Sequence, residues 1–240
     1  MTSMSRTGHR ESSGSLFAAA WRPAGVLYLA FCLAGLAAGL WPRAIFVPRG
    51  DAGGAPLPAL KTLVVAQIAF GLLVWPLGAL RRARLGAARR YWSAAIAEAA
   101  VYLVLAVPFY IAAAYLADAV AEDVVRAVIY VACVWTLPLA AGAHLAAGRP
   151  GRGAVMLVLL LAAMGLPAAH YIALEFLAPP SAEFLSRLSP ATFAWAASAS
   201  RGAAWYPQPL WAILVWPAVA AAATFLLMLI RPAPPAGVRQ

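Results

Sequence analysis

Apolar residues dominate the chain in six long runs, which are separated by charged residues or by clusters of proline and glycine. A membrane-spanning helix needs about 20 such residues, and each run has roughly that length. The runs are continuous and rich in alanine and leucine, without the two-residue alternation of a membrane β-barrel. We therefore expect an all-α protein with six transmembrane helices, at residues 24–46, 60–80, 92–117, 124–147, 153–177 and 209–230.

Composition supports a single membrane domain. Hydrophobic residues make up 64% of the 240 residues and charged residues 11%, whereas a soluble domain has about 25% charged residues. Residues 1–23 are polar and carry three arginines before a run of full spanning length, which is atypical of a cleaved signal peptide. We expect a cytoplasmic tail at 1–23, the six-helix domain at 24–230 and a cytoplasmic tail at 231–240.

The distribution of positive charge predicts the orientation of the spans. If residues 1–23 lie inside the cell, the inner segments hold 12 of the 18 basic residues and the outer segments hold the other six. Cytoplasmic segments of membrane proteins collect Arg and Lys, so we expect the N-terminus inside. An even number of spans then places the C-terminus inside as well. This bias also accounts for the net charge of +10, and we expect no nucleic-acid partner.

Two connections between the spans have unusual sequences. The first, 81-RRARLGAARRYW-92, is strongly basic; it is either a short surface helix with Tyr91 and Trp92 at the interface, or a plain topology signal. The second, 178–211, contains five prolines and is too polar to span but too apolar for a simple exposed loop. It predicts one or two short interfacial or re-entrant helices. Broken backbone at membrane depth must be covered by protein or line a wet cavity.

Catalytic and metal-binding patterns are missing from the sequence. It contains no GxxxxGK[ST] phosphate loop, no HExxH and no paired cysteines. Cys32 and Cys133 fall inside apolar runs and are interpreted as core residues. The spans contain a single serine, Ser93, so an intramembrane serine protease is not expected. We expect no catalytic residue, no metal and no cofactor in this chain.

Glu98 and His170 are ionisable residues inside expected spans. Glu98 lies about two helical turns into the third span, and such a residue is a functional hypothesis by default. The alternative is that Glu98 pairs with one of the arginines in 81–90. His170 lies in the outer half of the fifth span, five residues before Glu175, so the two point to different faces of a helix.

Three stretches of the chain resemble a known family. They are 188-LSPATFAWAASASRG-202, which is similar to an "LSP-T" stretch between the fifth and sixth helices, 144-HLAAGRPGRGAVMLVLLLAAMGLP-167 and 15-SLFAAAWRP-23. With the six expected spans, they resemble the transmembrane subunit of an ABC transporter of the ABC-2 type, the exporter class. The resemblance implies that the tail 1–23 contains a short interfacial helix before the first span. One stretch departs from the family: 81–92 has no acidic residue, where the family usually has an E-R-E-x-G-T-like pattern.

The resemblance implies specific partners and positions. A separate cytoplasmic ATPase would dock on 81–92, and a second copy or a similar permease would complete a pathway within membrane lipid. The implied docking residues are Arg81, Arg82, Arg84, Arg89 and Arg90. The implied outer gate segment consists of Leu188, Ser189, Pro190, Thr192 and Phe193. The composition, rich in alanine and arginine with one lysine, indicates a GC-rich bacterial genome, and hence a bacterial inner membrane.

Other classes of membrane protein remain as alternatives. A non-transporting scaffold or assembly factor fits the acid-free connection and the few polar residues in the spans. A lipid-modifying enzyme would need clustered carboxylates, His or Ser near one interface. A secondary transporter would show an internal repeat with paired broken helices, and the two halves of this sequence show no repeat.

Overall fold

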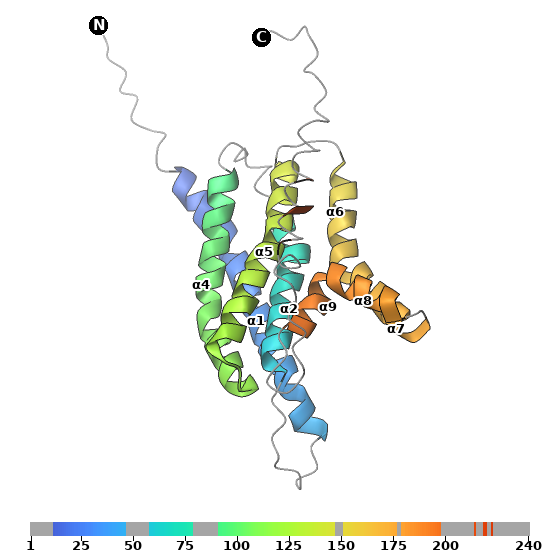
Figure 1. Cartoon of the computed structure of the whole chain (residues 1–240). Coiled ribbons are helices and arrows are strands. Elements are labelled where there is room, and N and C mark those ends of the chain that lie inside the picture. The colour runs from blue at the N-terminus through green and yellow to red at the C-terminus, as the bar shows by residue number, and fades with distance from the viewer. Residues whose placement is uncertain are drawn as a thin grey trace, which may run out of the picture.

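The computed structural model of the chain is helical throughout the part that it describes (Figure 1). That part comprises residues 12–46, 58–78, 91–146, 151–176 and 179–197, together with Leu214, Ala218, Val219 and Ala222. Five of its helices are long and apolar enough to cross a membrane: Pro23–Leu40, Ala59–Gly78, Ala94–Ala117, Ala121–Leu145 and Arg152–Phe176. The chain therefore has the helices of a multi-pass membrane protein.

The first five expected spans agree with these helices to within a few residues. The sixth, 209–230, lies outside the described residues except for four helical positions. The expected boundary at residue 23 is not a break in the backbone, because α1 runs without interruption from Ser12 to Phe46. Pro23 thus lies inside the helix, although proline disfavours helix interiors. A separate interfacial helix is not seen in the described part of the tail.

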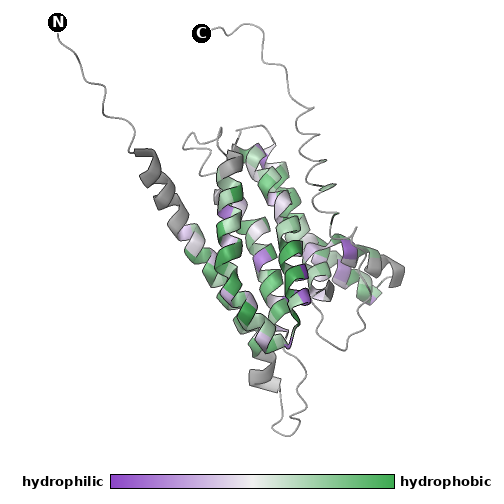
Figure 2. Ribbon diagram, turned by 60° about the vertical axis from the view of Figure 1, so that its left-hand side comes forward, coloured by the Kyte–Doolittle hydropathy of each residue, from purple (hydrophilic) through white to green (hydrophobic). Residues whose placement is uncertain are grey.

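Four helices form a bundle of alternating direction, with α2 and α5 at its centre (Figure 1). They are α1 (Ser12–Phe46), α2 (Ala59–Ala69) continued by the π-helical turn η1 (Phe70–Val74), α4 (Tyr91–Ala117) and α5 (Ala121–Ala146). About half of the spans containing α2 and α5 is buried, 56% and 50%, against 28% for α1 and 22% for α4. Figure 2 shows apolar residues over most of the length of these helices. The outer faces of α1 and α4 are therefore suited to lipid.

Small residues bring α1 and α2 into close contact. Gly35 and Gly39 are spaced four apart on the buried face of α1. A Cβ atom on Gly39 would lie 2.5 Å from the Cα atom of Ala59, and one on Gly35 would lie 2.9 Å from the Cβ atom of Ala66. A pair of glycines at this spacing lets helix backbones approach in membranes, where packing rather than water exclusion drives association.

The tight turn between α4 and α5 is closed by backbone hydrogen bonds. Asp118 adopts a left-handed conformation with φ of 48°, which aspartate tolerates better than most residues. The amide of Ala119 donates to the carbonyl of Ala114 at 3.0 Å, as in a Schellman helix end. Glu122 and Asp123 then occupy the first turn of α5, where carboxylates favour the positive end of the helix dipole.

The fifth span bends away from the bundle and leads to two short helices (Figure 1). It consists of α6 (Arg152–Leu160), the π-helical turn η3 (Leu161–Gly165) and α7 (Leu166–Phe176). α8 (Pro179–Leu188) packs along α7, and α9 (Pro190–Ala197) returns to contact α2 and α5. Two short helices thus occupy the described part of 178–211, and their interfacial or re-entrant position stays a prediction.

The contact between α1 and α2 predicts a specific sensitivity. We expect Gly39→Ala to destabilise the protein by about 1–3 kcal/mol, the usual cost of overpacking, because backbone atoms of α2 fill the space of the new methyl group. Unfolding in mixed detergent micelles measures the change. Gly153→Ala is the matched control, since nothing lies within 4 Å of a Cβ atom there; an equal loss in both variants would contradict the prediction.

Candidate functional site

A glutamine at the centre of the bundle joins four helices through hydrogen bonds. The side chain of Gln67, on α2, is fully buried. Its Oε1 accepts a hydrogen bond from the Tyr110 hydroxyl of α4 at 2.6 Å, and its Nε2 lies 3.8 Å from Cys32 Sγ of α1. Its backbone carbonyl accepts a hydrogen bond from Trp135 Nε1 of α5 at 3.1 Å. We call these four residues the Gln67 hub.

The hub lies next to the π-helical turn η1. A π-helical turn widens the helix and displaces backbone carbonyls from their usual i+4 donors. Pro76, two residues after η1, further removes one backbone donor. Trp135 packs against this turn, and a Cβ atom on Gly71 would lie 2.4 Å from Trp135 Nε1. Only glycine leaves room for the indole to approach and reach the Gln67 carbonyl.

A cluster of aromatic rings lies beside the hub. The ring centroid of Tyr28 lies 4.8 Å from that of Tyr102 and 5.0 Å from that of Phe70. Trp75 and Trp135 lie 5.3 Å apart in the same cluster. Such contacts contribute about 0.5–1.5 kcal/mol each beyond their buried area, so this part of the bundle is a well-packed core joining α1, α2, α4 and α5.

Glu98 is placed in this core, one turn before Tyr102. It is 5% exposed, and its Oε1 accepts a hydrogen bond from the Tyr102 hydroxyl at 2.7 Å. The arginines expected as alternative partners, 81–90, lie outside the described residues, so that pairing stays a prediction. His170 lies on α7, on the opposite side of the molecule from α4 (Figure 1). The structure therefore does not bring the two intramembrane ionisable residues together.

The expected outer gate segment forms the junction of α8 and α9. Ser189 precedes Pro190, the first residue of α9, and its Oγ accepts a hydrogen bond from the Thr192 amide at 3.4 Å. Serine before proline is a common start of a helix. Ser189 and Phe193 are buried, 0% and 2% exposed, while Leu188 is partly buried. The segment is thus packed protein rather than exposed loop.

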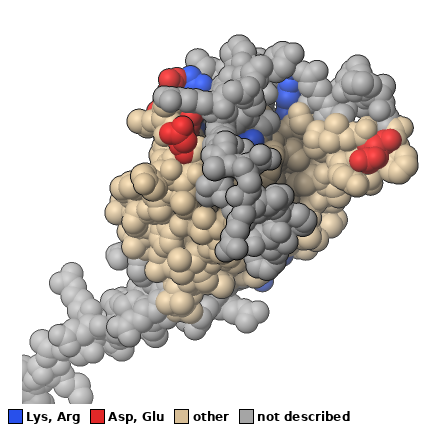
Figure 3. Space-filling model, turned by 90° about the horizontal axis from the view of Figure 1, so that it is seen from below, with Lys and Arg blue, Asp and Glu red and all other residues tan. Residues whose placement is uncertain are grey.

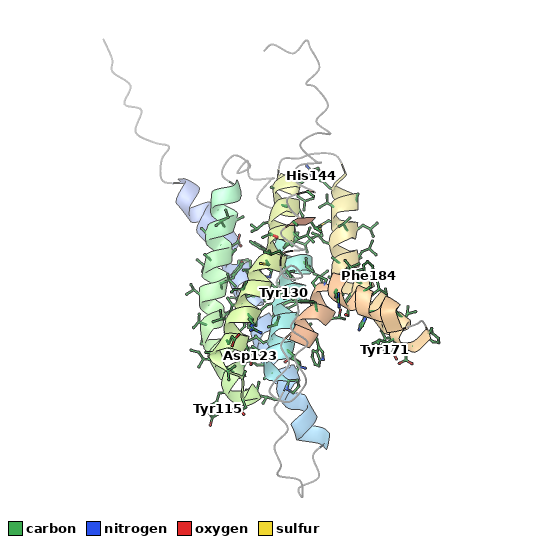
Figure 4. All side chains as sticks on the ribbon, in the orientation of Figure 1. Tyr115, Asp123, Tyr130, His144, Tyr171 and Phe184 are labelled. Atoms are coloured by element: carbon green, nitrogen blue, oxygen red, sulfur yellow. The ribbon has the colours of Figure 1, made fainter. Side chains whose placement is uncertain are left out.

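Two side-chain contacts attach α9 to the bundle (Figure 4). Tyr130 of α5 donates from its hydroxyl to the Pro190 carbonyl at 3.2 Å, and its ring lies 4.8 Å from that of Phe193. Lys61 Nζ of α2 lies 5.4 Å from the ring centroid of Trp195. A cation over an indole face is an attractive arrangement, and it places a charged group beside α9 at the start of α2.

Charged side chains are few on the described surface at this end of the protein. In the view from below, Figure 3 shows the acidic side chains at two well-separated places on the described surface. Glu122 and Arg126 of α5 form an ion pair one helical turn apart. Among the described residues, no group of three or more His, Cys, Asp or Glu residues could hold a metal ion. The arrangement is built for helix packing and contains no nucleophile beside a base in the sites described above.

The sequence analysis missed the Gln67 hub. Gln67 is the only amide side chain within the expected spans, and a polar residue at mid-span would have identified it. Tyr110 and Trp135 could not be identified in this way, because their roles depend on Gln67, which lies on another helix. The expected docking residues Arg81, Arg82, Arg84, Arg89 and Arg90 lie outside the described residues.

No protein-family model, no curated protein and no solved structure matches this chain. The resemblance to ABC-2 permeases therefore rests on the three stretches of sequence given above and stays a prediction.

The contact of Trp135 with the π-helical turn predicts a measurable difference between two tryptophans. Trp135→Phe removes the indole N–H that donates to the Gln67 carbonyl. Trp75→Phe removes the same group from a buried tryptophan whose Nε1 has no hydrogen-bond partner among the described residues. We expect the Trp135 variant to lose about 1 kcal/mol more unfolding free energy, the usual size of an interhelical hydrogen bond in a membrane. Detergent unfolding measures both; equal losses would show that the Trp135 hydrogen bond contributes nothing.

Proposed function

We propose that this chain is the membrane-spanning permease subunit of an ATP-driven exporter of the ABC-2 type, located in a bacterial inner membrane. The proposal rests on three expected features of the sequence. They are six spans with both ends inside, a basic connection after the second span and a broken segment before the sixth. The main structural support is the arrangement of α8 and α9. These two short helices follow the fifth span directly, and α9 packs back on α2 and α5.

In this proposal, a separate soluble ATPase supplies the energy. It docks on the basic connection 81–92, and its ATP-driven closure is passed to the helices that flank this connection. These are the helices α2 and α4, which are joined by the Gln67–Tyr110 hydrogen bond. A movement at 81–92 would therefore be transmitted to the centre of the bundle.

The exposed face of the fifth span fits a partner within the bilayer. Only 11% of Arg152–Phe176 is buried, and Leu157, Leu161 and Met164 are each more than half exposed. Lipid, or a second copy or a similar permease, would contact this face. The scarcity of polar side chains on the spans favours an apolar or lipid-like cargo.

A membrane scaffold is the second candidate, and the interior of the bundle favours it. The described polar groups at the centre are hydrogen-bonded to one another or packed among aromatic rings. Such a core is suited to a rigid body that presents its outer faces to other membrane proteins.

Affinity purification separates the two candidates. We expect the tagged protein, extracted from its native host in mild detergent, to carry a soluble ATPase with a phosphate-loop motif in stoichiometric amount. The combined change Arg81→Glu, Arg82→Glu and Arg84→Glu should remove the ATPase, because it reverses the charge of the docking surface. Mass spectrometry of the purified complex measures the ratio of the two chains.

The matched control keeps the charge at the same positions. Arg81→Lys, Arg82→Lys and Arg84→Lys should retain the ATPase if charge carries the contact. If no ATPase accompanies the unchanged protein under conditions that preserve other transporter complexes, the permease proposal is wrong and the scaffold reading takes its place.

A further inference from the structure

The two π-helical turns share one sequence arrangement. η1 (Phe70–Val74) is followed by Trp75 and then Pro76, and η3 (Leu161–Gly165) is followed by Leu166 and then Pro167. Proline lacks a backbone N–H and collides with the carbonyl four residues earlier. A wide turn just before the proline relieves that collision, and such turns are recognised sites of helix bending. The same local arrangement thus occurs twice in the described part of the chain.

The surroundings of η1 hold it in place. Phe70, Gly71 and Leu72 are all buried. Trp135 contacts Gly71 from the neighbouring helix and donates a hydrogen bond to the Gln67 carbonyl. Bending at η1 would break this hydrogen bond and open a well-packed aromatic core. The first turn is therefore a rigid part of the bundle.

The surroundings of η3 hold it on one side only, where it contacts η1 and α9. Ala162 is its only buried residue, and Leu161 and Met164 are 53% and 60% exposed. The three atoms nearest to a Cβ on Gly165 all belong to Leu161 of the same helix, whereas at Gly71 they belong to Trp135 of another helix. Among the described residues, no side chain of another helix approaches the glycine of η3 as Trp135 approaches that of η1.

The helices beyond η3 extend away from the bundle as a unit. We call α7 and α8 the arm. They pack on each other, and the arm leaves apolar side chains such as Tyr171, Ile172 and Phe184 more than half exposed (Figure 4). At its far end, the arm connects to α9, where Phe193 contacts Tyr130 and Trp195 contacts Lys61. The arm thus has a partly exposed π-helical turn at one end and side-chain contacts at the other.

We propose that η3 and Pro167 form a hinge about which the arm swings when the contacts of α9 with α2 and α5 are released, while η1 and Pro76 stay rigid. The proposal needs no ATPase and no cargo, so it stands independently of the permease function. It assigns opposite roles to two turns of the same sequence type, and the difference lies in whether a neighbouring tryptophan contacts the turn.

Distances between the arm and the bundle test the proposal. Spin labels on ketone-bearing amino acids at Phe184 of the arm and Val125 of α5 leave the two cysteines unchanged; both positions are more than half exposed. Double electron–electron resonance of the full chain in lipid nanodiscs gives the distance distribution. Trp195→Ala removes the cation–π contact, and we expect it to raise the population of a second distance by about two- to fivefold, the factor that such a contact provides.

Two proline variants then distinguish a hinge from general loosening. In the Trp195→Ala background, Pro167→Ala restores a backbone donor at η3, and we expect it to suppress the second distance. Pro76→Ala, the matched control at η1, should leave that distance unchanged. If Trp195→Ala does not fold, Lys61→Gln removes only the cation and serves in its place. The proposal would be overturned if every variant showed a single distance between the two labels. It would also be overturned if Pro167→Ala and Pro76→Ala changed the population of the second distance equally.

Discussion

The hydrogen bonds of Gln67 are the interaction on which the bundle depends. A bilayer offers no water to buried polar groups, so a buried polar group without a partner in the protein is costly. Gln67 meets this demand by binding α1 through Cys32, α4 through Tyr110 and α5 through its backbone carbonyl. Because these partners come from three helices, the bonds fix the rotation and height of each helix around α2. Apolar packing alone, with side chains as apolar as the lipid, specifies such a register weakly.

The positions of five spans could be predicted from the sequence because the length of an apolar run is set by the bilayer thickness. The junction of α8 and α9 was also predictable, since Ser189 and Pro190 are a typical helix start. The faces that pack together were not, because helices that are apolar on every side give no periodic signal. Trp135 and Gly71 acquire their roles only once α5 lies beside α2. The continuity of α1 through residue 23 was missed because Pro23 is a residue that usually ends or begins a helix.

The two halves of the described structure differ in how firmly they are held. The bundle of α1, α2, α4 and α5 is joined by the hub and by aromatic contacts, and its one π-helical turn is covered by Trp135. The fifth span is only 11% buried, and its π-helical turn contacts the bundle on one side while Leu161 and Met164 are more than half exposed. A rigid bundle beside a hinged arm suits a permease whose outer segments move during transport, and it also suits a scaffold that adapts to a partner.

The most direct test of this account is a double-mutant cycle between Gln67 and Tyr110, measured as unfolding free energies in mixed micelles. Gln67→Leu and Tyr110→Phe each remove one side of the hydrogen bond, and the Tyr115→Phe change, at a residue 89% exposed, controls for loss of a hydroxyl. The account predicts a coupling energy of about 1 kcal/mol between the two positions, so that the double variant is more stable than the sum of the single losses implies. Strictly additive losses would show that the two side chains act independently and would contradict the central role of Gln67.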